Sequence, residues 1–176
     1  DIINGVSNAK WRRMQAGNDN PLLNRAIRGQ YPPGSTFKMV TALAAFEAGK
    51  INLKEQIQCS GKYELADQTY RCWNRSGHGR CNFHRALRES CDVYFYELGH
   101  RLGIRRIAAM ARKLGLGVAH DLGLGPEKIG IIPDPDWKQG RYNRGWFHGE
   151  TILASIGQGY VLSTPLQLAV MTARLA

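Results

Sequence analysis

The stretch Gln30-Tyr31-Pro32-Pro33-Gly34-Ser35-Thr36-Phe37-Lys38 decides the fold, because a long helix is expected to begin inside it. The two prolines and the glycine break any preceding element and make the approach to the helix stiff. Good helix formers follow up to Gly49, and their apolar residues are spaced as in a helix that packs on several sides. Ser35 therefore lies at a helix N-terminus, where free backbone N–H groups favour developing negative charge.

Lys38 follows Ser35 by three residues and so lies on the same helix face. A serine hydroxyl is a weak nucleophile until a neighbour accepts its proton, and a lysine amine accepts a proton only in its neutral form. From these residues alone two interpretations are open. Ser35 is either a helix cap beside a solvated lysine, which is the commoner case for Ser-x-x-Lys, or a nucleophile beside its base.

A second motif, Ser90-Cys91-Asp92, stands between two predicted helices. Alone it would read as a capping serine and a first-turn aspartate, both common at helix starts. With Ser35 and Lys38 upstream, we favour a catalytic interpretation. A carboxylate at Asp92 favours the charged form of Lys38, so Ser90 is expected to carry more of the proton traffic.

The composition indicates one globular domain with a real core. The 176 residues carry 24 basic and 14 acidic side chains, a net charge of +10. The basic residues are spread along the chain, which favours a solvated surface over a nucleic-acid site. The sequence has neither an apolar run of membrane-spanning length nor a signal peptide. It starts without Met and stops inside a helical pattern, so we expect a piece of a longer protein.

The periodicity predicts a helical body with two excursions, one small at 51–81 and one long and irregular at 115–149. In the first, short extended segments alternate with turns. A short helix over 9–15 is expected to turn Trp11 and Met14 toward the core, and Asn18 to Pro21 to form a loop. Further helices are predicted over 83–87, from Asp92, over 104–114, and from Pro165, with Thr164 as N-cap and Gln167 completing a capping box.

The segment 31–38, Tyr-Pro-Pro-Gly-Ser-Thr-Phe-Lys, resembles class B transpeptidases of the penicillin-binding protein 2 type, as do Ser90-Cys91-Asp92 and Ile-Gly-Gln-Gly-Tyr at 156–160. The resemblance implies an α/β fold. Residues 1–176 would be a partial transpeptidase domain, the mostly helical portion of the β-lactamase-like fold, with much of its antiparallel sheet absent. It makes Ser35 the acylated nucleophile, Lys38 its proton acceptor and Ser90 a proton relay. Asp92 would hold Lys38.

The resemblance also implies a D,D-transpeptidase that cross-links peptidoglycan stem peptides, is inhibited by β-lactams and needs no cofactor for its chemistry. The longer protein would be anchored at the periplasmic face of a bacterial inner membrane. There it would serve elongation and cell shape with a glycan polymerase and other elongation-complex proteins. The family's third motif, Lys-Thr-Gly, does not occur in these residues. That strand would supply one oxyanion donor, so we expect the chain alone to be inactive.

Cys59, Cys72, His78 and Cys91 fall in or beside the first excursion, and no pair has Cys-x-x-Cys spacing. Several outcomes are open: a disulfide of Cys72 with Cys81, or of Cys59 with either; a merely buried Cys91; a turn residue at His78. Some penicillin-binding protein 2 relatives that the chain resembles carry zinc near the active site. A Cys₃His site would be tetrahedral and structural, and would fix Ser90.

Two alternative functions use the same residues differently. Class D β-lactamases and penicillin-sensor domains share the nucleophile segment but carry Ser-x-Val, and Asp92 speaks against them. The second alternative is a non-catalytic basic zinc module that binds nucleic acid. It would give Ser35 no role, and the sequence lacks the basic stripe that it would need. In the long excursion, Arg141, Trp146 and His148 are candidates for substrate binding because they lie in an open loop.

Overall fold

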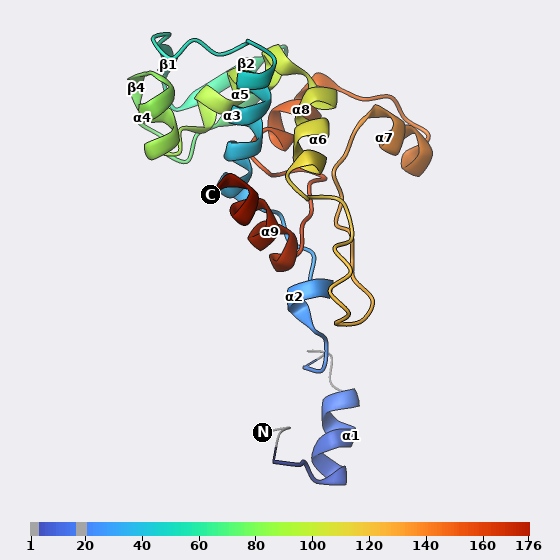
Figure 1. The fold of residues 1–176 in the computed structure, drawn as a ribbon. Coiled ribbons are helices and arrows are strands. Elements are labelled where there is room, and N and C mark those ends of the chain that lie inside the picture. Colours follow the sequence, from blue (N-terminus) through green and yellow to red (C-terminus); the bar gives the residue numbers. More distant parts are fainter. Residues whose placement is uncertain (1–3, 17–20) are drawn as a thin grey trace.

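The structure is a computed structural model that describes residues 4–16 and 21–176. Most helices gather into one body, and α1 lies apart from it at the far end of the view in Figure 1. The described helices are α1 (Asn8–Ala16), α2 (Arg25–Arg28), α3 (Lys38–Glu47), α4 (Phe83–Arg88), α5 (Asp92–Leu102), α6 (Ile104–Lys113), α7 (Pro135–Tyr142), α8 (His148–Ala154) and α9 (Pro165–Leu175).

The centre of the body is α3, which packs against α5 and α6. A single 3₁₀ turn, Gly34–Phe37, precedes α3, so the expected helix begins at the predicted place but with a tighter first turn. Buried apolar side chains from the 3₁₀ turn and these helices form the core: Phe37, Val40, Ala44, Phe95, Leu98 and Ile107.

Helix α8 lies close against α5, and a glycine makes this approach possible. A Cβ atom at Gly99 would lie 2.5 Å from Cβ of Ser155. Thr41 of α3 also donates its hydroxyl to the carbonyl of Ser155 at 2.7 Å. The end of α8 is thus fixed to the helix that begins next to Ser35.

The first excursion forms two small antiparallel sheets, so the predicted extended segments are confirmed. Strands β1 (Ile57–Cys59) and β4 (Gly79–Cys81) pair with Gln58 opposite Arg80. Strands β2 (Lys62–Leu65) and β3 (Gln68–Arg71) form a hairpin. The described chain is therefore mostly helical with a few short antiparallel strands, as the fold-class prediction required.

The second excursion is less irregular than expected, and the prediction is wrong over α7. Asp134 caps this helix by accepting a hydrogen bond from the backbone N–H of Trp137, and Pro135 occupies the first helical position. The buried Lys138 then pairs with Glu150 of α8, with its amine 4.3 Å from the ring centre of Phe147. This ion pair attaches α7 to α8.

The prediction that Trp11 and Met14 face a core is also wrong. Helix α1 has no buried residue, and Trp11 is 38% exposed, because the helix has too few apolar residues to form a stripe. Of the predicted loop at 18–21, residues 18–20 lie outside the described residues, and Pro21 lies in a turn.

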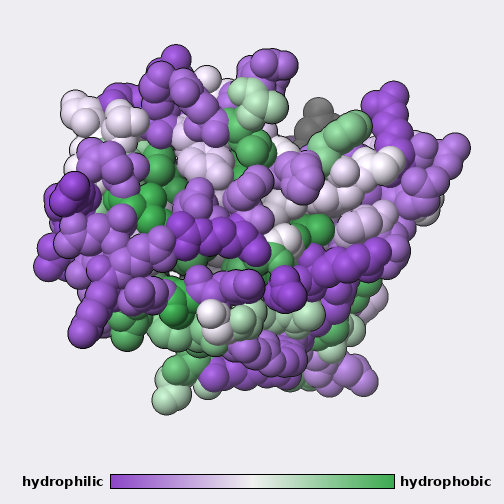
Figure 2. All heavy atoms as spheres, turned by 90° about the horizontal axis from the view of Figure 1, so that it is seen from above, coloured by the Kyte–Doolittle hydropathy of each residue, from purple (hydrophilic) through white to green (hydrophobic). Residues whose placement is uncertain are grey.

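At the C-terminal end, Thr164 and Gln167 form the predicted capping box at the start of α9. Ser163, just before it, pairs with Tyr31 in an isolated antiparallel bridge. None of the described helices combines the length and the apolarity that a bilayer crossing needs. The face in Figure 2 is largely hydrophilic, with smaller hydrophobic areas between.

Candidate active site and metal centre

Lys38 is a buried cation whose hydrogen-bonding capacity is filled. Its side chain begins one turn after Ser35 and the residue is only 1% exposed. The amine donates to the Ser90 carbonyl at 2.8 Å, to Ser90 Oγ at 2.9 Å and to Asp92 Oδ1 at 2.6 Å. An ammonium group has three hydrogens, so each has a partner. Such satisfaction is what allows a charge to remain away from water.

Ser90 connects Lys38 to Ser35. Its hydroxyl accepts from Lys38 and lies 2.9 Å from Ser35 Oγ, to which it donates. Its backbone has φ of +54°, a left-handed conformation that is uncommon for residues other than glycine. That conformation belongs to the tight link between α4 and α5, and it lets both oxygens of Ser90 face the same amine.

Asp92 is the first residue of α5 and is 8% exposed. One carboxylate oxygen accepts from Lys38, and the other accepts from the backbone N–H of Trp73 at 2.8 Å. The helix N-terminus also favours a negative charge at this position. The structure therefore brings together the four residues that the two motifs predict: Ser35, Lys38, Ser90 and Asp92.

Trp73 belongs to the same cluster, and sequence reasoning missed it as a site residue. Its indole Nε1–H lies 3.1 Å from the carbonyl of Ser90 and 3.2 Å from that of Glu89. The one available signal is that Trp73 directly follows the candidate ligand Cys72. Phe95 was missed too; its ring centre lies 5.6 Å from the amine of Lys38.

The loop after α8 supports the turn that carries Ser35. The backbone N–H of Gly34 donates to the carbonyl of Gly157 at 3.0 Å. Gly157 has φ of +70°, and a Cβ atom there would lie 2.4 Å from the carbonyl oxygen of Gly34. Only glycine combines that conformation with so close an approach.

The three residues of the long excursion that were predicted to bind substrate have surroundings different from those of Lys38. Arg141 is exposed on α7, and Trp146 donates its indole N–H to Thr151 Oγ1 at 2.8 Å. His148 begins α8 and borders a mainly apolar pocket between the β2–β3 hairpin and α8. Substrate binding by these three residues stays a prediction.

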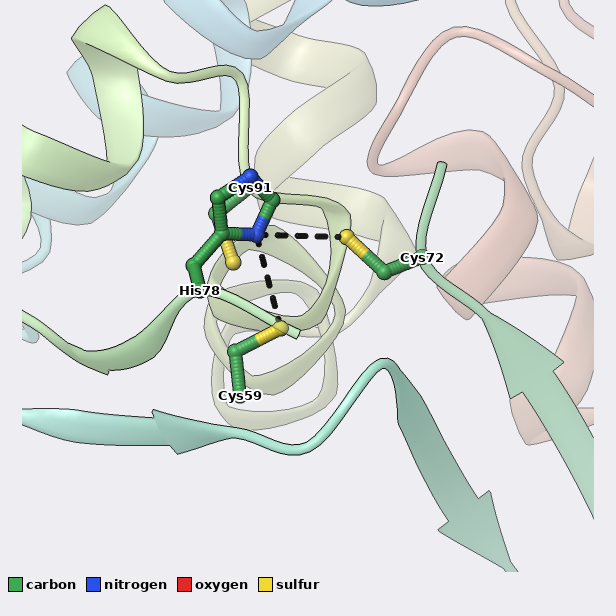
Figure 3. A group of neighbouring side chains, drawn as sticks. All are labelled: Cys59, Cys72, His78 and Cys91. Atoms are coloured by element: carbon green, nitrogen blue, oxygen red, sulfur yellow. Dashed lines mark hydrogen bonds between the residues drawn. The ribbon is translucent and has the colours of Figure 1, made fainter. Parts of the chain in front are cut away.

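Cys59, Cys72, His78 and Cys91 converge on one buried point (Figure 3). Their ligand atoms all lie within 4.8 Å of one another, and His78 Nδ1 lies 3.6 Å from Sγ of both Cys59 and Cys72. All four cysteines are free thiols, so the disulfide alternatives are wrong. Cys81 stays outside the group and donates its S–H to the carbonyl of His78.

This geometry fits a tetrahedral metal site. Zn–S and Zn–N bonds of ordinary length place sulfur and nitrogen about 3.5 Å apart in a tetrahedron, close to the 3.6 Å observed. Burial, with a neighbouring thiol adding to it, raises the pKa of the Cys72 and Cys91 thiols above the usual range. A cation at the centre would instead favour the thiolates. The cluster could therefore hold a metal ion.

The two sites share their backbone. Cys91 separates Ser90 from Asp92, and Cys72 precedes Trp73. The ring of Trp73 also meets that of His78 edge to face, with centres 5.3 Å apart. An ion held by the cysteines would thus constrain the backbone of the second motif, Ser90-Cys91-Asp92.

Comparison with known proteins agrees with this geometry. Residues 5–176 match the model of the penicillin binding protein transpeptidase domain. The peptidoglycan D,D-transpeptidase MrdA of Acinetobacter baumannii is 38% identical over 174 residues, which are 98% of this chain and 26% of that protein. The chain thus spans about a quarter of this relative's length.

Solved structures show the same relation. Pseudomonas aeruginosa PBP2, in complex with WCK 5153, superimposes with a TM-score of 0.91 at 41% identity, covering 97% of this chain and 38% of that one. Helicobacter pylori PBP2, in a complex with MreC, gives 0.87 at 40% identity, covering 93% and 31%. The chain therefore belongs to the penicillin-binding protein transpeptidase family, and within it to the PBP2 (MrdA) type, of which it covers a part.

Proposed function

We propose that the chain is part of a peptidoglycan D,D-transpeptidase that works through an acyl-enzyme on Ser35. The observation that carries this proposal is the unbroken series of hydrogen bonds from Lys38 through Ser90 to Ser35. The D,D-transpeptidase activity named for its relative supports it. A basic nucleic-acid module would give this series of hydrogen bonds no role. Class D β-lactamases carry Ser-x-Val, so the ion pair of Asp92 with Lys38 argues against that alternative.

The resting hydrogen bonds run from Lys38 toward Ser35, and acylation needs the reverse direction. With Lys38 neutral, Ser35 donates its proton to Ser90 Oγ while Ser90 passes its own proton to the amine. Ser35 Oγ then attacks the carbonyl carbon of the penultimate D-Ala of a stem peptide. As the peptide bond breaks, the same relay returns a proton to the departing D-Ala amine.

The second half-reaction uses the same groups. An amine of a neighbouring stem peptide attacks the ester carbonyl, loses a proton to the relay and releases Ser35, which completes the cross-link. A β-lactam acylates the same Ser35 oxygen, but the ring-opened acyl group is released slowly. Asp92 stabilises the protonated state of Lys38 that forms in each half-reaction.

Transition-state stabilisation needs two N–H donors for the carbonyl oxygen. The helix start at Ser35 offers one, and a Lys-Thr-Gly strand supplies the other in the family. One such donor is worth about 10²–10³ in rate. Because the 176 residues contain no Lys-Thr-Gly, we expect this chain alone to be acylated far more slowly than a longer protein that includes such a strand.

The ion at the cysteine cluster is proposed to be a structural Zn²⁺ with a closed Cys₃His coordination by Cys59, Cys72, His78 and Cys91. It takes no part in the chemistry. It would join the ends of β1 and β3 to the segment that carries Ser90.

The longer protein is proposed to act at the periplasmic face of a bacterial inner membrane, in cell elongation. A relative of similar structure has been solved with MreC. By analogy, we propose elongation-complex proteins, including a glycan polymerase, as partners, and no nucleic acid.

Intact mass after incubation with a penicillin tests the proposal. The 176-residue chain and a form extended through a Lys-Thr-Gly strand are each compared with their Ser35→Ala variants. A mass gain on the extended form that Ser35→Ala abolishes is expected. If the extended form gains no mass, or gains it equally without Ser35, the transpeptidase proposal is wrong.

A further inference from the structure

Trp73 has most of its surface in water but its polar groups in the site. The residue is 63% exposed, so burial of its ring contributes little to the core. Its backbone N–H donates to Asp92 and its indole N–H lies on the carbonyls of Ser90 and Glu89. One residue from the first excursion thus holds both ends of the second motif.

We propose that Trp73 is a positioning residue that fixes the Ser90 peptide in the orientation needed for proton relay; this inference rests on the proposed function. The Ser90 carbonyl accepts from Lys38 at 2.8 Å and from Trp73 Nε1 at 3.1 Å. The two donors fill both lone pairs of that oxygen and set the plane of the peptide.

The left-handed backbone of Ser90 makes such a support necessary. A φ of +54° at a residue other than glycine costs on the order of 1 kcal/mol, and it persists only where the surroundings hold it. If the peptide relaxed, the carbonyl would leave Lys38 and the hydroxyl would move from its place between Lys38 and Ser35. Trp73 acts through Ser90 and touches neither reacting atom in the described contacts.

The same contacts connect the metal cluster to the relay. The candidate ligand Cys72 directly precedes Trp73, and the rings of Trp73 and His78 meet edge to face. Both ligands are therefore placed to hold the indole over the Ser90 carbonyl.

The test removes the indole N–H that lies on the Ser90 carbonyl and keeps the backbone N–H that donates to Asp92. Trp73→Phe keeps a ring and the backbone N–H. In the extended protein, saturation kinetics with a fluorescent penicillin separate the acylation rate constant from the dissociation constant of the initial complex. We expect the rate constant to fall about tenfold, the value for one lost hydrogen bond, with the dissociation constant within about twofold.

Two controls separate positioning from folding. Trp11→Phe makes the same change on α1 and should leave both constants unchanged. Melting temperature and zinc content of Trp73→Phe should match the wild type, since the ligands remain. Incorporating benzothienylalanine at position 73 replaces the N–H by sulfur within the same shape, and should reproduce the slower acylation even if the Phe variant folds poorly.

Unchanged acylation with benzothienylalanine would overturn the inference. So would a slower rate that is matched by lost zinc or a lower melting temperature in both variants, because that would make Trp73 a structural residue. Failure of the proposed function would look different: the wild type itself would then not be acylated at Ser35.

Discussion

The amine of Lys38 lies 2.6 Å from Oδ1 of Asp92, and both residues are buried. Breaking such a pair by removing one partner leaves the other charge without compensation, which costs about 3–5 kcal/mol. Asp92 also receives the backbone N–H of Trp73, so it joins the nucleophile helix, the second motif and the first excursion.

Replacing Asp92 tests what its charge contributes. Asp92→Asn removes the counter-charge but keeps one acceptor oxygen of the same shape for Lys38, so we expect penicillin acylation to slow by no more than about tenfold. Asp92→Ala removes both the counter-charge and the acceptor, so one N–H of the buried Lys38 amine keeps no partner; acylation should fall at least about 100-fold, and the free energy of unfolding by about 3–5 kcal/mol. Acylation rates and urea unfolding measure both, and equal rates for the two variants would contradict this view.

Ser90→Ala tests the relay. The substitution removes the hydroxyl between Lys38 and Ser35 but leaves the backbone carbonyl, so acylation should slow by about 10²–10⁴, the usual range for general acid–base groups. Ser60→Ala, on an exposed turn, is the control. If Ser90→Ala is acylated at the wild-type rate, Lys38 takes the proton from Ser35 directly.

The local features of the chain could be predicted from its sequence. Ser35 and Lys38 share a helix face by spacing alone, and the capping box at Thr164 is a sequence signature in itself. The four ligands of the cysteine cluster could be named from their residue types and from the resemblance, but not the distances between them.

What escaped prediction depends on contacts between distant segments. The contact of Trp73 with Ser90 joins residues 17 positions apart, and no pattern encodes it. Helix α7 was missed because its Gly, Asp and Trp content suggested a loop, although Asp134-Pro135 was a usable start signal. Met14 was expected in a core, but no residue of α1 is buried.

Metal removal should expose the cysteine cluster. In the wild type we expect about one zinc per chain, thiols protected from labelling, and a clear fall in melting temperature after chelation. Cys72→Ala should lose the metal. Cys81→Ala is the matched control, since Cys81 is equally buried and lies outside the cluster. Mass spectrometry of the native protein and cysteine labelling measure this; equal labelling with and without chelator, and no bound metal, would remove zinc from the proposal.

The ion pair of Glu55 with Arg101 should make the free energy of unfolding depend on pH. Arg101 donates to both carboxylate oxygens, at 2.8 and 2.9 Å, and this lowers the pKa of Glu55 from its ordinary value of 4.5. A carboxyl group whose pKa is lowered by folding stabilises the fold above its unfolded pKa, and that contribution is lost as the pH falls through the folded value.

Thermal unfolding at a series of pH values tests this dependence. Between about pH 5 and pH 3 the melting temperature of the wild type should fall more steeply than that of Glu55→Gln. Glu64→Gln is the control: the pKa of Glu64 is also lowered, by Lys62, but both side chains are more than half exposed and solvent screens the pair. Parallel curves for Glu55→Gln and the wild type would rule out this role.

Alanine substitutions at Gly157 and Gly159 together test the contact between the loop after α8 and the turn that carries Ser35. Both have φ of +70°, so an alanine strains the backbone equally at either position. At Gly157 the new Cβ would also lie 2.4 Å from the carbonyl oxygen of Gly34, whereas at Gly159 the nearest atom is Cβ of Leu153 at 3.3 Å. Overpacking of this kind costs about 1–3 kcal/mol.

Gly157→Ala should therefore unfold more easily than Gly159→Ala by about 1–3 kcal/mol. It should also be acylated more slowly, because the Cβ atom can be accommodated only by moving the turn that carries Ser35. Urea unfolding and penicillin acylation, measured on both variants, decide between a structural and a catalytic effect. If the two variants acylate alike, the loop after α8 supports the fold without setting the position of Ser35.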